Sequence, residues 1–472
     1  MAVATSAEPA PTRRLEATAV AGLRRVLTGE VFGPADDGYD EHRRVWNGSI
    51  DRHPALVVRC RGVDDVRAAL RFGRDQQLPI AVRSGGHSFP GLSTCEDGLL
   101  IDLRLMSGVR VDPDARTVGV QAGVLLGELD AATQEHGLAV PAGIVSHTGL
   151  TGLTLGGGIG WVQRKYGLTV DSLASADVVT ADGSFVRAAE DENTDLFWGL
   201  RGGGGNFGIV TDFRFRLVPV GPQVMAGAAF WPIDQAASVL RRYRDWIAGC
   251  PDELMTLVVQ RLAPPLPAVP TELVGRPVIA VAACYAGDVA EGERVLRPMR
   301  EFGSPVLDLF GAKPFVAHQQ MFDPSFRHGC WYYVRSCDVA ELSDDVIDVV
   351  VEHGRRISSP VSSIALWQMG GAVARVGEDE TAFNGRSTGF TFNINGNTVT
   401  ADGFDEQRQW ARDYWSALAP FHTGVYVNFL MEEGEDRVRA AYGGAKYERL
   451  RSLKRAYDPT NVFRMNQNIR PD

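Results

Sequence analysis

Three clusters of glycine restrict how this chain can fold more than any other feature of its sequence. The chain has 52 glycines among 472 residues, and they gather at residues 85–86, 149–160 and 202–208. Glycine lets the backbone adopt positive φ and approach a ligand closely, because it has no Cβ. Evenly spaced glycine would favour flexible linkers, whereas clusters indicate loops that surround a bound group.

The first cluster lies in IAVRSGGHS, residues 80–88, where an apolar strand runs into Gly85, Gly86 and His87. Backbone N–H groups in such a turn are able to hold a pyrophosphate, and the histidine adds a nucleophilic nitrogen beside it. Taken alone, the segment fits a tight turn followed by a hydrogen-bonded histidine better than a pyrophosphate site. Both interpretations stay open at this point.

The third cluster contains the spacing GxGxxG at Gly203, Gly205 and Gly208. A Rossmann dinucleotide site needs a strand before this motif, a helix after it and an acidic residue about 20 positions further on. Here the alternating segment 209–218 predicts a strand after the motif, and no acid lies near Ala228. The sequence therefore excludes a Rossmann site.

The pattern of apolar residues changes after Pro219. Before it, short strand-like runs alternate with helical ones, and after it the glycine clusters cease. The expected strands are 56–59, 80–83, 99–103, 117–122, 209–218 and 278–284, and the expected helices are 63–76, 125–136 and 236–246. This organisation predicts a glycine-rich binding domain, an inserted sheet domain and a C-terminal return.

Composition excludes several classes of protein. Hydrophobic content of 44% and charged content of 22% are typical of a globular protein, and 472 residues suit two or three domains. The net charge of -10 with no basic block argues against nucleic acid or an anionic membrane as a partner. The six cysteines form no CxxC pair, so neither disulfides nor a metal site is expected.

The N-terminus has only part of the pattern of an export signal. Arg13 and Arg14 form a twin-arginine pair, but Glu16 and Arg24 interrupt the residues after it, so no continuous apolar signal core is present. No run reaches the 18 or so apolar residues of a membrane span. We expect a loose tail, an amphipathic first helix and a cytoplasmic protein.

Five motifs in the right order identify a family. They are RSGGHS at 83–88, GLTGLTLGGGIGWVQRKYGLTVD at 149–171, DLFWGLRGGGGNFGIVT at 195–211, YVN at 426–428 and YDPTNVFRMNQNI at 457–469. With these motifs the chain resembles the berberine-bridge-enzyme-like FAD-linked oxidases, which have the vanillyl-alcohol-oxidase type of flavin fold. It resembles in particular the bacterial branch that includes 6-hydroxy-D-nicotine oxidase, and the resemblance runs from about residue 39 to 471.

The resemblance implies an α+β fold of two domains. Residues 30–218 and 425–472 would form the FAD-binding domain, and residues 219–424 would form a substrate domain whose antiparallel sheet covers the flavin. The loop Arg83–Ser88 would wrap the pyrophosphate through Arg83, Ser84, Gly85, Gly86 and Ser88. His87 matches the histidine that the family bonds to the flavin 8α-methyl group.

Further cofactor contacts are implied by the same resemblance. Glycines of the second cluster would pass close to the ring and ribityl chain; they are Gly152, Gly156, Gly157 and Gly158. Ile209 would approach the adenosine diphosphate half. Asn428 and Asn466 would lie beside the flavin. Val145 stands where many relatives have a second, cysteinyl attachment, so a single covalent bond is expected. His147 lies near the expected flavin edge, where it either contacts the flavin or serves as a hydrogen-bonded structural histidine.

The catalytic base is missing from its usual place. Relatives that oxidise alcohols or phenols commonly have YxNY, but this chain has Tyr426, Val427, Asn428 and Phe429. Phenylalanine accepts no proton, so either another group serves or the substrate needs no strong base. Tyr426, Tyr332 and Gln368 are the candidate catalytic residues, because the last two fall on segments expected to face the cavity.

The expected function is therefore oxidation by covalently bound FAD. A small or medium-sized substrate, such as an alcohol, an amine or a compound of polyketide or phenolic type, would transfer hydride to the flavin, and O2 would be reduced to H2O2 by a monomer or homodimer. A bacterial origin and secondary metabolism are expectations from the resemblance. The alternatives are a dehydrogenase of the same fold with another acceptor, and a flavin-binding protein without catalytic activity.

Overall fold

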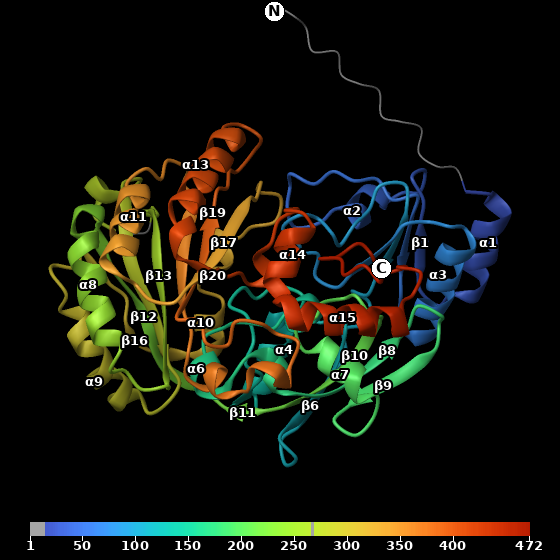
Figure 1. Cartoon of the computed structure of the whole chain (residues 1–472), viewed down its shortest axis with the longest axis horizontal. Coiled ribbons are helices and arrows are strands. Elements are labelled where there is room, and N and C mark those ends of the chain that lie inside the picture. The colour runs from blue at the N-terminus through green and yellow to red at the C-terminus, as the bar shows by residue number, and fades with distance from the viewer. Residues whose placement is uncertain (1–14, 266–268) are drawn as a thin grey trace, which may run out of the picture.

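Residues 15–265 and 269–472 are described by a computed structural model. Arg13 and Arg14, and with them the expectation about an export signal, lie outside the described residues. Two lobes lie side by side, one built around the glycine-rich loops and the other around a large sheet (Figure 1). The expected first helix is α1, Ala17–Val26, which turns Leu23 toward the interior.

A four-stranded sheet carries the first glycine turn. Its order is β1-β2-β4-β3, with β2, β4 and β3 parallel and β1 antiparallel to β2. The strands are β1 (Glu30–Phe32), β2 (Leu56–Arg59), β3 (Ile80–Arg83) and β4 (Leu99–Asp102), and α3 (Val63–Asp75) connects β2 to β3. The expected β-α-β unit is present, with β4 between its two strands. Because β3 ends at Arg83, the turn begins directly at the end of a buried strand.

A five-stranded antiparallel sheet supports the third glycine loop. Its order is β5-β6-β10-β8-β9. The strands are β5 (Val109–Asp112), β6 (Thr117–Gln121), β8 (Leu173–Val179), β9 (Phe185–Ala189) and β10 (Ile209–Arg216). Helix α7 (Thr194–Leu200) precedes the loop and β10 follows it. This is the reverse of the order that a Rossmann site requires.

A nine-stranded antiparallel sheet fills the other lobe. Its order is β15-β12-β14-β13-β18-β19-β17-β20, with β16 also paired to β12. The strands are β12 (Gln223–Pro232), β13 (Leu254–Leu262), β14 (Pro277–Tyr285), β15 (Leu307–Asp308), β16 (Gly311–Pro314), β17 (Val334–Val339), β18 (Ser363–Gln368), β19 (Phe390–Asn395) and β20 (His422–Gly424). All of them fall between residues 223 and 424.

The longer helices of this lobe cover one face of the sheet. They are α8 (Ala236–Ile247), α9 (Val289–Arg300), α11 (Asp344–Gly354) and α13 (Phe404–Ala417), at the left of Figure 1. Their apolar stripes pack on Val258, Leu366 and Phe392, which are completely buried. Side chains of a strand alternate between the two faces, so the neighbouring residues point toward the other lobe.

The C-terminal segment returns to the glycine-rich lobe. Helices α14 (Glu435–Tyr442) and α15 (Gly444–Tyr457) place Tyr442, Tyr447 and Leu450 in the same core as Phe207 and Phe213. The remaining helices and strands are α2 (Tyr39–Arg43), α4 (Leu126–Gln134), β7 (Leu138–Ala139), α5 (Leu150–Leu155), α6 (Gln163–Tyr166), β11 (Val218–Pro219), α10 (Phe315–Gln319) and α12 (Ala372–Arg375).

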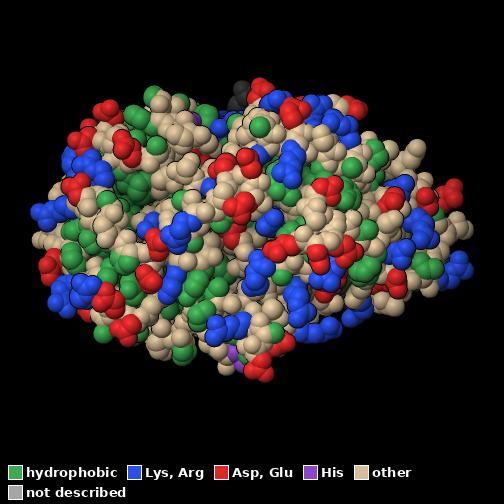
Figure 2. Space-filling model, turned by 60° about the horizontal axis from the view of Figure 1, so that its bottom comes forward, with side chains coloured by type: hydrophobic (Ala, Val, Ile, Leu, Met, Phe, Trp, Pro, Cys, Tyr) green, Lys and Arg blue, Asp and Glu red, His purple; other side chains and the backbone are tan. Residues whose placement is uncertain are grey.

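The outside of the molecule carries charges of both signs. Basic and acidic side chains are interspersed over the face shown in Figure 2. Within residues 15–265 and 269–472, we find no helix with the length and apolar character needed to cross a membrane.

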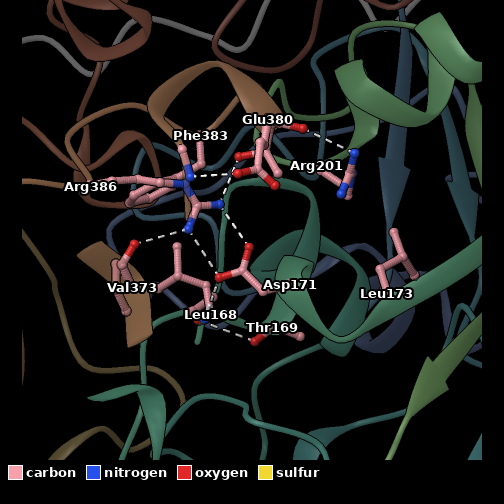
Figure 3. Close-up of polar contacts among 12 residues, drawn as sticks. Leu168, Thr169, Asp171, Leu173, Arg201, Val373, Glu380, Phe383 and Arg386 are labelled. Carbon is pink, nitrogen blue, oxygen red and sulfur yellow. Dashed lines mark hydrogen bonds and ion pairs between the residues drawn. The ribbon is translucent and has the colours of Figure 1, made fainter. Parts of the chain in front are cut away.

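A buried ion pair connects the sheet lobe to the segment that follows the second glycine cluster. Arg386 is 2% exposed, and its two terminal nitrogens donate to the Asp171 carboxylate at 2.7 and 3.1 Å (Figure 3). The same guanidinium donates to the Thr381 hydroxyl at 2.7 Å. Asp171 in turn accepts the backbone N–H of Leu168 at 2.8 Å. This network holds the chain that follows the second glycine cluster.

Candidate functional site

A cavity of ≈380 Å³ lies between the two lobes, and both contribute to its wall. One side, which we call the loop wall, consists of the glycine loops and the C-terminal return. The other side, the sheet wall, consists of β13, β18 and β19 with the segment 322–326. The residues that line the cavity are far apart in the chain, from Trp46 to Gln467.

Most of the sequence-predicted cofactor residues border this cavity. They are Ser84, Gly85, Gly86, His87, Ser88, Gly152, Ile209, Asn428 and Asn466. The other four lie behind the wall. Arg83 donates to Asp102 at 2.8 Å and to the Arg44 carbonyl at 2.8 Å, so it holds the loop from below. Gly156, Gly157 and Gly158 pack against protein atoms instead of open space.

The glycines in and behind the loop wall have two different roles. A Cβ on Gly85 would lie 2.2 Å from the backbone nitrogen of Gly149, so these two loops touch through their backbones. A Cβ on Gly156 would lie 2.1 Å from the Asn428 side chain, which needs that space. By contrast, a Cβ on Gly152 or Gly205 would meet nothing within 4 Å. The first group closes the wall and the second leaves it open to a ligand.

His87 is held on three sides. Its ring stacks on Trp46 with centroids 4.6 Å apart and an interplanar angle of 15°. Its Nε2 lies 2.7 Å from Nδ1 of His147, and its Nδ1 lies 3.4 Å from the Thr148 hydroxyl. Burial lowers the pKa of His87 well below its usual range, and the imidazoles of His147 and His328 lower it further. The ring is therefore neutral at pH 7.

The three histidines form a cluster that the sequence did not indicate. The ligand nitrogens of His87, His147 and His328 lie within 4.8 Å of one another, a grouping that also suits a metal ion. Burial lowers the pKa of His147 and of His328 as well. His328 is exposed, and His147 is half-buried. Of the two expectations for His147, the hydrogen bond to His87 supports the structural one.

The YVNF segment borders the cavity near the second glycine cluster. The Tyr426 hydroxyl accepts the Gly158 N–H at 3.0 Å and the Asn428 amide at 2.8 Å. Burial raises the pKa of Tyr426 to about 12, so the phenol stays protonated at neutral pH. Phe429 packs edge-on against Tyr426 with centroids 4.9 Å apart. The phenyl ring of Phe429 is no proton acceptor.

The sheet wall consists of cross-strand rows of side chains. Arg261 of β13 pairs with Ser363 of β18, which pairs with Asn395 of β19. The next row is Val259, Ala365 and Asn393. Leu257 and Trp367 are opposite each other beyond it. All of these residues line the cavity, so the wall is polar at one end and apolar at the other.

Tyr332 and Gln368 do not line the cavity, which corrects our expectation for both. Gln368 follows Trp367 on β18, so it points to the opposite face, where its Oε1 accepts the Thr256 hydroxyl at 2.8 Å. Tyr332 lies before β17 begins, beneath Trp46, with centroids 3.7 Å apart. Its hydroxyl donates to the Arg327 carbonyl at 2.6 Å.

Sequence reasoning missed several residues of the wall. The unpredicted residues are Trp46, Arg261 and Ser363 of the cavity wall and His328 beside His87. For the sheet wall a signal was present, because Leu257, Val259 and Arg261 recur with the period of two that a strand requires. For Trp46 and His328 none was present, since only the tertiary fold brings them to His87.

Comparison with known proteins identifies the family. The FAD binding domain family matches residues 54–189, and the family described as "Berberine and berberine like" matches residues 425–470. An FAD-linked oxidoreductase of Dictyostelium discoideum is 32% identical to this chain, over 94% of this chain and 95% of its own length.

Solved structures have the same fold. 6-Hydroxy-D-nicotine oxidase from Arthrobacter nicotinovorans gives a TM-score of 0.84 at 28% identity, covering 94% of this chain and 98% of that chain. Glucooligosaccharide oxidase from Acremonium strictum, described with a 6-S-cysteinyl, 8α-N1-histidyl FAD, gives a TM-score of 0.84 at 24% identity, covering 96% and 99%. The two-domain α+β fold of the vanillyl-alcohol-oxidase type is confirmed. The chain is an enzyme that belongs to the berberine-bridge-enzyme-like family of FAD-linked oxidoreductases.

Proposed function

We propose that the protein is an FAD-dependent oxidase that holds its flavin by one covalent bond to His87. It takes hydride from a small or medium-sized organic substrate, and O2 accepts the two electrons to give H2O2. The observation that carries the proposal is the shared cavity, where a neutral, oriented His87 and open glycine loops face a sheet wall.

The residues of the loop wall fit FAD. Gly152 and Gly205 leave space where any side chain would project. Ser84 Oγ and Asn466 Oδ1 are buried with no hydrogen-bond partner among residues 15–265 and 269–472. No Asp or Glu is among the described residues that line the cavity, so nothing there repels a pyrophosphate. When bound, FAD supplies the acceptor for hydride and transfers its electrons to O2.

Two features support attachment through His87 alone. The imidazole is neutral, so a lone pair is free to form a bond, and Trp46 and His147 hold its plane and one nitrogen. Val145 borders the cavity where relatives have a cysteine, and its side chain offers no thiol. Glucooligosaccharide oxidase is described with both a histidyl and a cysteinyl bond. We propose the histidyl bond only.

The remaining predicted residues act through position. We propose that Arg83 fixes the loop of residues 84–88, which with Ile209 and Asn466 contacts the cofactor. Gly156 leaves room for Asn428, Gly157 for Phe383 and Tyr426, and Gly158 for Thr169. The FAD-binding domain would comprise residues 30–218 and 425–472, and the substrate domain residues 219–424. All strands of the nine-stranded sheet fall within that last range, which supports the division.

The absence of a base at Phe429 limits the substrate. A protonated Tyr426 with a pKa of about 12 does not accept a proton at pH 7. We propose a substrate that releases hydride without a strong base, such as an amine or an acidic enol.

Rapid mixing of the reduced holoenzyme with air-saturated buffer tests the oxidase proposal. Reoxidation within seconds, with one H2O2 formed per flavin, is the expected result. Slow reoxidation would indicate a dehydrogenase that uses another acceptor. Anaerobic reduction of the flavin by a member of a panel of alcohols, amines and phenols excludes a protein that only binds flavin.

A further inference from the structure

Arg261 is a cationic side chain on the cavity wall without an anionic partner. The residues that line the cavity, within the chain as described, include no Lys, Asp or Glu, and Arg261 is their one arginine. Its guanidinium donates to the Ser325 hydroxyl at 2.8 Å and, at 3.3 Å, to the neighbouring Leu262 carbonyl. Both partners are neutral, so the positive charge is not compensated.

Even partial burial makes an uncompensated charge unfavourable. Removing a guanidinium from water is unfavourable unless an anion or a full set of acceptors replaces the water. Burial lowers the pKa of the Arg261 side chain, and no carboxylate opposes that shift. Arg386 shows how a buried arginine is usually compensated, since the two carboxylate oxygens of Asp171 accept hydrogen bonds from its terminal N–H groups. An uncompensated charge that faces a cavity is instead available to a ligand.

The neighbours of Arg261 form a polar end of the sheet wall. Ser363 and Asn395 lie beside it in one cross-strand row, and the Asn395 amide oxygen has no partner in the described structure. Leu257 lies four residues before Arg261 on β13, which is about 13 Å at strand spacing. There the wall is formed by Leu257 and Trp367. A ligand that matches this wall has an apolar body and an anionic end.

The position of Arg261 favours a substrate over the flavin pyrophosphate. The segment 322–326 connects Arg261 to the His87 side of the cavity. The Ser325 hydroxyl accepts a hydrogen bond from Arg261, and the Phe326 carbonyl accepts one from the Trp46 indole N–H at 2.8 Å. Trp46 stacks on His87. The glycines expected to meet the pyrophosphate and adenosine lie on the loop wall, where Gly204 and Gly205 border the cavity.

We propose that Arg261 binds an anionic group, such as a carboxylate, of an otherwise apolar substrate. The side chains of Ser325, Ser363 and Asn395 lie beside this binding position. This inference rests on the proposed function, because it assigns the cavity beside the flavin to the substrate. It defines the substrate class as acids with an aromatic or aliphatic body.

Calorimetric titration of the purified holoenzyme with cinnamate and with cinnamamide tests this assignment. The two probes have the same apolar body, and only one carries a charge. We expect wild type to bind cinnamate at least about tenfold more tightly, the range of a charge-assisted hydrogen bond. Arg261→Met should reduce the ratio to about one, and Arg261→Lys should retain part of it. Arg276→Met, which removes an exposed arginine beside the same sheet, should leave it unchanged.

Three results would overturn the proposal. They are equal binding of both probes by wild type, an unchanged preference in Arg261→Met, and loss of flavin from Arg261→Met, which would assign the guanidinium to the cofactor. Flavin content is read from visible absorbance of the same samples. A wild-type protein without flavin would refute the proposed function, and the calorimetric ratio would still decide the role of Arg261.

Discussion

Two arginines of the sheet lobe differ in what surrounds their charge. Arg386 is buried against Asp171, which accepts two of its N–H groups, and it holds the chain behind the glycine loops (Figure 3). Arg261 faces the cavity with only neutral partners. The first arrangement satisfies its charge within the protein, as a structural contact does. The second leaves the charge available to a ligand. Whether an arginine has a carboxylate partner therefore distinguishes a structural residue from a ligand-binding one.

Arg386→Met tests the structural side of this comparison and should have the largest effect. It leaves the Asp171 carboxylate, whose side chain is 9% exposed, without its cation. We therefore expect the free energy of unfolding to fall by about 3–5 kcal/mol. Urea unfolding followed by circular dichroism measures the change. Adding Asp171→Asn to the variant should restore part of the loss.

An exposed pair provides the control for that experiment. Arg408 and Asp405 form an ion pair with side chains 35% and 94% exposed. Arg408→Met should cost less than about 1 kcal/mol, because exposed pairs contribute little. Equal losses in Arg386→Met and Arg408→Met would contradict a special role for the buried pair.

Asp130 is a third buried ionisable group, and its variant should depend on pH. It lies on α4, where the Gln319 amide donates to it at 3.1 Å, and burial raises its pKa to about 7 from 3.8. The unfolded chain therefore releases this proton at lower pH than the folded chain. Wild type loses stability from this group as pH rises from about 4 to about 7, and no more above that range.

Asp130→Asn removes this titration. The variant should gain stability over wild type as pH rises, with a largest gain on the order of 4 kcal/mol above pH 7. Thermal unfolding at pH 5 and pH 8 measures the difference. A gain that is the same at both pH values would show that burial does not raise this pKa.

His147→Gln tests how the loop wall prepares His87. Losing a hydrogen bond of about 1 kcal/mol should slow covalent attachment by about fivefold. Flavin fluorescence of the denatured protein band, followed after FAD is added to apoprotein, gives the rate. His136→Gln, at a position outside the cavity wall, is the matched control and should not slow attachment. Equal rates in wild type and His147→Gln would remove His147 from this role.

Arg261→Met should have the smallest effect on stability. No carboxylate is left unpaired when its charge is removed, so the free energy of unfolding should change by less than about 1 kcal/mol in either direction. The same urea experiment measures it beside Arg386→Met. A loss as large as that of Arg386→Met would show that Arg261 is a structural residue and would remove the contrast.

The sequence predicted the loop wall well because its signal is local. A strand, a glycine pair and a histidine lie within nine residues, so β3 and the turn after it were identified together. The strand that follows residues 202–208 was likewise visible in the alternating pattern of β10.

The sheet wall was predicted less well because its signal is distributed. Arg261, Ser363 and Asn395 come together through the pairing of three strands that are far apart in the chain. The error at Gln368 has a simple cause, since a shift of one residue along a strand reverses the face to which a side chain points. Tyr332 was misplaced because the strand begins two residues later, at Val334.

Intact mass and colour of the denatured protein test the central claim most directly. Wild type should remain yellow after denaturation and carry a flavin-sized mass increment, whereas His87→Ala should lose both. Flavin that washes out of denatured wild type, or an increment that persists in His87→Ala, would contradict attachment through His87.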